Sequence, residues 1–77
     1  MNWIETEKEN KKVWYADGGF ARFNILEDEN EDTRTYTVFL GLRTDVGKEN
    51  FYYDFRPISF FKELSNAQKV CELINNG

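Results

Sequence analysis

Between Arg34 and Arg43, hydrophobicity alternates more regularly than anywhere else in the chain. Successive side chains of a β-strand point to opposite faces of a sheet, so this period of two predicts a strand. The side expected to face a core carries Tyr36, Val38, Leu40 and Leu42, and the other side carries Thr35, Thr37, Phe39 and Gly41. The chain has 77 residues, and a domain of this length hides only a little over ~60% of its unfolded surface. We therefore expect a single small domain, residues 1–77, built around one core.

The best local hairpin signal lies near the start of the chain. Lys11 to Ala16 is rich in β-prone residues, Asp17-Gly18-Gly19 suits the positive-φ positions of a tight turn, and Phe20 to Leu26 is β-prone again. Residues 1–10 are mostly polar, and we expect them to form either a short leading strand or a loose arm.

Turn and loop signals flank the alternating strand. The segment from Glu27 to Thr33 has no apolar residue, and its carboxylates repel one another, which favours a solvated loop. The segment from Thr44 to Lys48 is expected to be a turn. A fourth strand should follow, with Phe51, Tyr53 and Phe55 on one face and Asn50, Tyr52, Asp54 and Arg56 on the other. Pro57 is expected to end it, because proline cannot donate a ladder hydrogen bond.

The C-terminal part reads as a helix. Ser65-Asn66-Ala67-Gln68 matches a capping box, and apolar residues recur every three or four positions from Ala67 to Ile74. A start near Ser59 is the alternative, because Ile58, Phe61 and Leu64 continue the same spacing backwards. The predicted fold class is α+β: an antiparallel meander of about four strands with one C-terminal helix packed on one face.

Residue types that commonly carry catalysis are scarce. The chain has no histidine, and its single cysteine, Cys71, lies among apolar helix positions that disfavour a thiolate. Asp28, Asn30 and Asp32 match the start of a calcium loop, but Thr33 stands where such a loop needs glycine. No glycine-rich phosphate motif is present. We expect a protein that is not an enzyme and has neither cofactor nor metal.

Net charge and hydropathy limit the classes of partner that we expect the protein to bind. The formal net charge of −4 disfavours nonspecific binding to nucleic acid and to anionic membranes. The start of the chain does not resemble a signal peptide, and no stretch approaches the ~20 apolar residues of a membrane span. We therefore expect a cytoplasmic protein whose partner is another protein, with nucleic acid and a second copy of the chain as alternatives and no membrane contact.

Two surfaces are candidates for binding. Alternation predicts an uncovered sheet face that combines aromatic and basic side chains, namely Arg22, Asn24, Thr37, Phe39, Arg43, Tyr52 and Arg56, together with Trp14. The second candidate is the acidic loop, which contains Glu27, Asp28, Glu29, Glu31 and Asp32. Each has a simpler interpretation: an ordinary cross-strand pair or dimer contact for Phe39 and Tyr52, and a solvated loop for the acids.

The sequence favours a small acidic binding protein, an adaptor or inhibitor of a larger macromolecule. An acidic surface with aromatic anchors can occupy the basic channel of a protein that handles nucleic acid. A second hypothesis is a domain that binds single-stranded nucleic acid, in which aromatic rings of the sheet stack on bases and guanidinium groups neutralise phosphates. A third is a structural subunit of an assembly.

Overall fold

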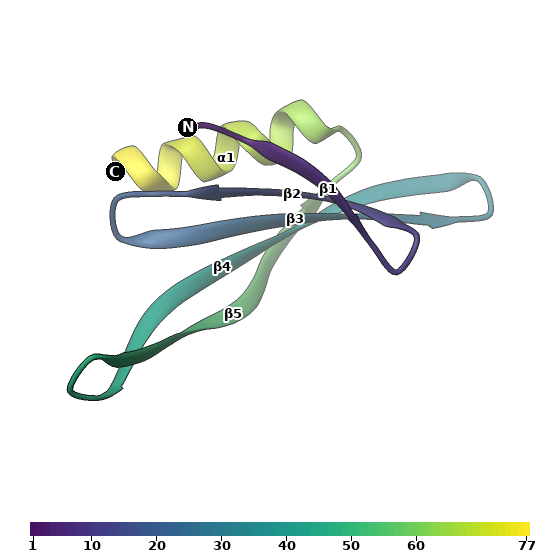
Figure 1. Ribbon diagram of the computed structural model, residues 1–77. Coiled ribbons are helices and arrows are strands. Elements are labelled where there is room, and N and C mark those ends of the chain that lie inside the picture. Colours follow the sequence, from purple (N-terminus) through teal and green to yellow (C-terminus); the bar gives the residue numbers. More distant parts are fainter.

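Five antiparallel strands pair in the order in which they occur along the chain, and one helix lies across one face of the sheet (Figure 1). The structure is a computed structural model and describes residues 1–77. The elements are β1 (Ile4–Lys8), β2 (Lys11–Asp17), β3 (Ala21–Asn30), β4 (Thr33–Gly47), β5 (Asn50–Phe61) and α1 (Leu64–Asn76). The predicted α+β meander with a C-terminal helix is confirmed, with one strand more than expected.

The additional strand is β1. Glu9 and Asn10, which connect it to β2, have φ values of 53° and 66°. Two successive positive φ values are characteristic of the type I′ turn that closes a two-residue hairpin. Residues 1–10 therefore include a paired strand, which was one of the two predicted alternatives.

The core lies between the sheet and α1, on what we call the helix side of the sheet. Its buried residues are Trp14, Ala21, Phe23, Ile25, Tyr36, Val38, Ala67 and Cys71. In β4, Tyr36 and Val38 are buried as predicted and Leu40 packs against the core, whereas Leu42 is 49% exposed. Leu42 pairs with Ala21, the first residue of β3, so it lies in the last row that three strands share.

Beyond that row, β4 and β5 continue as a two-stranded ribbon, which we call the distal hairpin (residues 43–53). It projects away from the helix in Figure 1. The molecule exposes 5799 Å², whereas a compact monomer of its mass exposes about 4,900 Å². Its radius of gyration is 13.2 Å, against about 11.5 Å for a compact chain of this length. The fold thus leaves more surface in solvent than its size requires.

The two connections around β4 are shorter than predicted. The segment from Glu27 to Thr33 is not a loop: β3 runs to Asn30, β4 begins at Thr33, and only two residues form the turn. Ion pairs from Lys11 to Asp28 (3.1 Å) and from Arg34 to Glu29 (3.5 Å) offset the repulsion in this hairpin. The predicted turn from Thr44 to Lys48 is also wrong, because β4 continues to Gly47.

β5 does not end at Pro57. Val38 pairs with Ser59 while its neighbour Phe39 pairs with Pro57, so Ile58 is an extra residue, a β-bulge. Proline is tolerated here because β5 is an edge strand and because bulges interrupt the ladder. The bulge also changes which side each residue faces: Ser59 faces the helix side, whereas Pro57 faces away from it.

The helix begins at Leu64, close to the later of the two predicted starts. The capping box prediction is wrong, because Glu63 occupies the N-cap position without a side-chain hydrogen bond and Ser65 lies within the first turn. At the other end, the Gly19 amide donates to Oδ1 of Asn75 at 2.9 Å. This bond ties the end of α1 to the β2–β3 turn.

Candidate functional site

The sheet face turned away from α1, which we call the open face, gathers aromatic side chains from three strands. The strand registers place Tyr15, Phe39, Phe51, Tyr53, Phe55 and Phe60 there. Phe60 is 72% exposed, and Phe51 is 47% exposed. Aromatic side chains supply large contact areas at binding surfaces, and this row is the largest aromatic cluster outside the core.

A groove runs along the open face. One part has a volume of about 350 Å³, with an apolar floor of Val13, Leu26, Phe39 and Phe55 beside Asn24. The side chains of Lys8, Glu9 and Lys11 line its rim. A second hollow of about 320 Å³ shares Val13, Asn24 and Phe55 with the first and continues it toward Tyr15 and Arg22.

Gly41 gives the groove its floor. It is buried opposite Phe55 in the β4–β5 ladder, and a β-carbon at position 41 would lie 2.5 Å from the Phe55 ring. The ring can pack down onto the sheet only because Gly41 has no side chain. Phe55 thereby lines both parts of the groove.

Two guanidinium groups of the open face are neutralised within the molecule, whereas Lys8 at the groove rim has no ion pair. Arg22 lies 2.6 Å from Asp17, and Arg43 lies 3.1 Å from Asp45. The same two guanidinium groups lie over aromatic rings, Arg22 at 4.3 Å from the centre of Tyr53 and Arg43 at 4.0 Å from that of Phe51. These contacts give the open face apolar character with little net positive charge.

Three of the predicted sheet-face residues lie where the sequence places them. Arg22, Phe39 and Arg43 are on the open face, and so are Asn24 and Thr37. Tyr53 and Phe55 lie beside them on the same face. The alternation in the sequence predicted that these two residues face away from Tyr52, but it did not connect them to this site.

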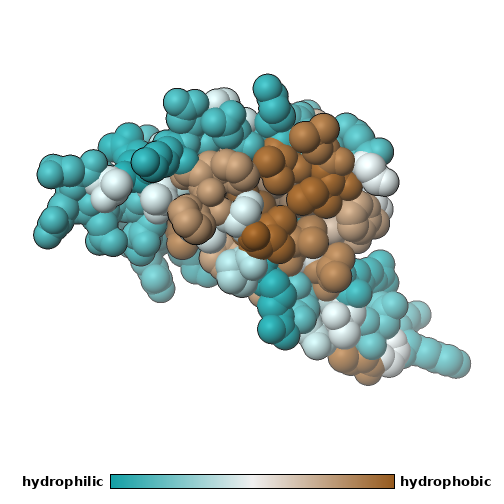
Figure 2. Space-filling view, turned by 180° about the vertical axis from the view of Figure 1, so that it is seen from behind, coloured by the Kyte–Doolittle hydropathy of each residue, from teal (hydrophilic) through white to brown (hydrophobic).

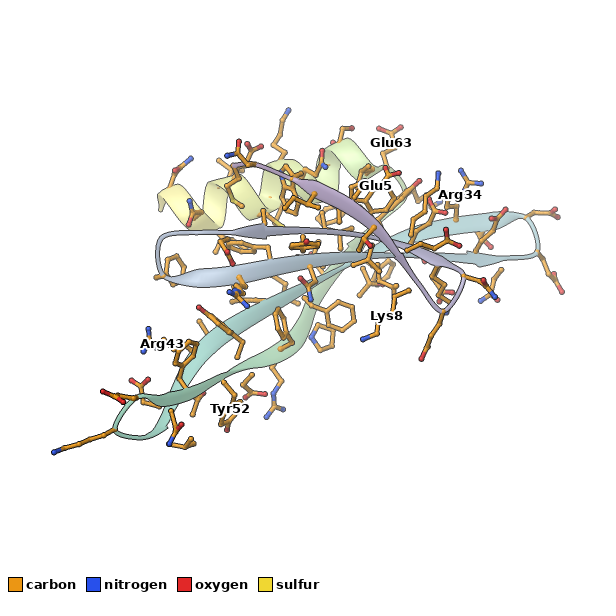
Figure 3. The ribbon with its side chains drawn as sticks, in the orientation of Figure 1. Glu5, Lys8, Arg34, Arg43, Tyr52 and Glu63 are labelled. Atoms are coloured by element: carbon orange, nitrogen blue, oxygen red, sulfur yellow. The ribbon has the colours of Figure 1, made fainter.

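Trp14, Tyr52 and Arg56 lie on the helix side, so their predicted placement is wrong. Trp14 is 6% exposed, and its Nε1 donates to Oε1 of Glu5 at 2.9 Å. The extra residue Ile58 reverses the side that the preceding residues of β5 face, and Tyr52 and Arg56 therefore lie on the helix side. Figure 3 shows Arg43 and Tyr52 pointing to opposite sides of the distal hairpin. A proline inside a strand pattern was the signal of such a bulge.

The five predicted acids form the end of the β3–β4 hairpin, which we call the acidic hairpin (residues 27–32). Asp28 faces the open face, Glu27 and Glu29 face the helix side, and Glu31 and Asp32 form the turn. Only Asp28 and Glu29 take part in ion pairs. The other three carboxylates leave this end of the molecule negative.

The carboxylates of the acidic hairpin affect the neighbouring Arg34. A hydrogen bond with Tyr36 and the charges of Glu29 and Glu27 raise the pKa of Arg34 above its usual value. Figure 3 shows Arg34 and Glu63 at the same end of the sheet. The guanidinium of Arg34 is therefore a fixed positive charge within an otherwise acidic surface.

Cys71 is fully buried between α1 and the sheet. Burial raises the pKa of its thiol from 9.0 to about 11, and a backbone hydrogen bond opposes only part of that shift. The neutral thiol packs as a small apolar group. The structure also brings no three Cys, Asp or Glu side chains together in the way that a metal ion requires.

Comparison with family models, curated proteins and solved structures finds no match. No helix combines the length and the apolar composition that a membrane crossing requires.

Proposed function

We propose that this protein is a small non-enzymatic binding protein, an adaptor or inhibitor, that holds a larger protein through the groove and the acidic hairpin. The observation that carries this proposal is the aromatic groove on the open face, which remains in solvent although the chain has a separate core. An exposed apolar surface of this kind, rimmed by polar residues, is typical of protein interaction sites.

The groove and the acidic hairpin adjoin one another. Leu26 lines the groove, and Asp28 lies two residues further along β3 on the same face. Two residues of a strand span about 7 Å, so one partner side chain in the groove brings its neighbours within reach of the carboxylates. The expected partner surface is an apolar anchor flanked by Lys or Arg.

Proteins that handle nucleic acid present basic surfaces of this kind. An acidic protein that binds there with an aromatic anchor competes with the nucleic acid for the same site. The three carboxylates of the acidic hairpin without an ion pair, Glu27, Glu31 and Asp32, are the groups available for this contact. This supports inhibition of such a protein as the specific form of the proposal.

The charges of the open face argue against single-stranded nucleic acid as the ligand. Phosphate binding needs uncompensated cations, but Arg22, Arg43 and Lys11 each pair with an aspartate. Two of these groups also cover the rings on which bases would stack. A nucleic acid strand would have to break these pairs, whereas an apolar protein side chain would not.

The test is affinity capture from nuclease-treated host lysate with matched variants. Phe39→Ala removes part of the groove floor, and the double variant Glu31→Gln with Asp32→Asn neutralises the acidic turn. The matched control, Glu49→Gln with Glu63→Gln, removes two exposed carboxylates elsewhere. We expect one protein to be captured by the wild type and the control and lost by both test variants.

Titration with single-stranded oligonucleotides over a range of salt concentrations completes the test. Tight binding that weakens steeply with salt and fails in Phe39→Ala would replace the proposal with nucleic acid recognition. Capture that is the same for all four proteins would also contradict it, because the contact would then lie outside the groove and the acidic hairpin.

A further inference from the structure

We propose that the outer edge of β5 in the distal hairpin pairs with the same edge of a second copy of this chain. The two-fold axis passes at Tyr53, and the two sheets join into one. This inference does not depend on the proposed function, because it is argued from the strand edge and the helix side, and Phe55 is the one groove residue that it involves.

The two edges of the sheet differ sharply. The outer strand β1 has five residues, three of them charged, which is how natural sheets prevent unwanted pairing. The opposite edge strand, β5, has twelve residues, and only Asp54 and Arg56 are charged. A long aromatic edge such as this is a template for a further strand.

The register shows which backbone groups β5 offers. The two-residue turn after Asn30 makes Asn30 and Thr33 a hydrogen-bonded pair, so even-numbered residues of β4 direct their amide and carbonyl groups toward β5. Their partners in the distal hairpin and next to it are Tyr52, Asp54 and Arg56. The intervening residues Phe51, Tyr53, Phe55 and Pro57 therefore direct their backbone groups outward.

Pro57 selects the position of the two-fold axis. It lacks an N–H, so it limits the usable edge to Asn50–Arg56. An axis at Tyr53 pairs Phe51 with Phe55 of the second copy and uses only residues that have an amide. An axis at Phe55 would instead place Pro57 opposite Tyr53 and lose hydrogen bonds.

The facing side chains are also compatible in this register. On the open face, aromatic residues meet aromatic residues, an arrangement that favours antiparallel pairing. On the helix side, Tyr52 faces Asp54 of the second copy, so a phenol can donate to a carboxylate, and Arg56 faces Asn50. No two like charges are opposed.

The excess of exposed area is comparable with one side of a standard protein interface. The molecule exposes about 900 Å² more than a compact monomer of its mass, and a standard interface buries about 800 Å² on each partner. On the helix side, Leu42 is 49% exposed, Tyr52 is 51% exposed and Leu73 is 66% exposed. Figure 2 shows a continuous brown surface on the body of the molecule, above the projecting distal hairpin.

The two-fold symmetry places this apolar surface at the interface between the two copies. A two-fold axis perpendicular to the joined sheet keeps both helices on the same side. Glu72 points toward Met1, with 3.5 Å between Oε1 and the terminal nitrogen. Val70 lies about 200° away around the helix, toward β5, so the two copies of this flank approach one another.

Sedimentation equilibrium of the purified chain between about 1 μM and 500 μM tests the proposal. We expect the mass to rise from 9.2 kDa toward twice that value. Tyr52→Glu places a carboxylate opposite Asp54 of the second copy and should raise the dissociation constant at least about tenfold. Thr6→Glu makes the matched change on the β1 edge and should leave the constant unchanged. Far-UV circular dichroism checks that both variants fold.

Oxidative cross-linking tests the register independently of the affinity. Tyr53→Cys places a cysteine at the two-fold axis, where facing α-carbons lie about 5.5 Å apart and can be bridged by a disulfide. We expect Tyr53→Cys to form a covalent dimer and Thr6→Cys to remain monomeric, with buried Cys71 unreactive in both. A wild-type mass of 9.2 kDa at every concentration, or equal weakening by Tyr52→Glu and Thr6→Glu, would overturn the proposal.

Discussion

The ring of Phe55 covers Gly41 so closely that a β-carbon at position 41 would lie 2.5 Å from the nearest ring atom. This cross-strand pair joins the two strands that form the distal hairpin and forms the floor of the groove. The shape of the candidate binding surface therefore depends on the absence of one methyl group.

Gly41→Ala is expected to displace the Phe55 ring and to lower the free energy of unfolding by about 1–3 kcal/mol, the usual penalty for overpacking. Urea denaturation measures the change. Gly19→Ala is the control, because nothing lies within 4 Å of a β-carbon there, and its stability should be unchanged or slightly raised. Equal stability of Gly41→Ala and the wild type would show that Phe55 does not rest on the sheet.

Deletion of Ile58 is expected to turn Phe51, Tyr53 and Phe55 from the open face to the helix side. Removing the extra residue shifts the register by one, and such a shift reverses every side chain of the strand beyond it. Nuclear Overhauser contacts between the Phe55 ring and the Gly41 α-protons show which side of the sheet Phe55 faces. They should vanish on deletion and persist in the control Ile58→Ala.

Glu5→Ala is expected to destabilise the protein, because the Trp14 indole N–H would lose its acceptor in a buried position. An unsatisfied buried donor costs about 1–3 kcal/mol. Urea denaturation followed by tryptophan fluorescence measures the loss. Glu7→Ala removes the next acid on the same side of β1, which accepts no such bond, and should have little effect. Similar losses in the two variants would assign the effect to strand charge.

Cys71 is expected to make stability fall at alkaline pH. The pKa of the thiol is raised from 9.0 to about 11 in the folded protein, so the unfolded chain loses its proton first as the pH rises. The contribution of Cys71 is complete below pH 9.0 and declines between pH 9.0 and about 11. The free energy of unfolding, measured across that pH range for the wild type and for Cys71→Ala, separates the contribution of Cys71 from those of the tyrosines and lysines. Parallel curves for the two proteins would contradict the shift.

Local patterns predicted much of the fold. The alternation of β4 placed Tyr36 and Val38 in the core, and the spacing from Ala67 to Ile74 placed Ala67 and Cys71 against the sheet. Both signals are periodic over a whole element, so an error at one end does not change the side that the residues face. The acids of residues 27–32 were also correctly read as a charged surface, although most of them lie in strands.

The tertiary structure decided which surface is available for binding. A period of two leaves open which of two faces is the buried one, and the bulge at Ile58 exchanges the faces within a single strand. Trp14 lies in the core because the pairing of β2 with β3 determines the side that it faces. Its indole N–H donates a hydrogen bond to Glu5 in β1. The sequence by itself determined the elements, the charge and the excess of aromatic residues. Only the pairing of β4 with β5 determined that Phe39, Tyr53 and Phe55 share one open face, because register is a property of two strands and not of either one.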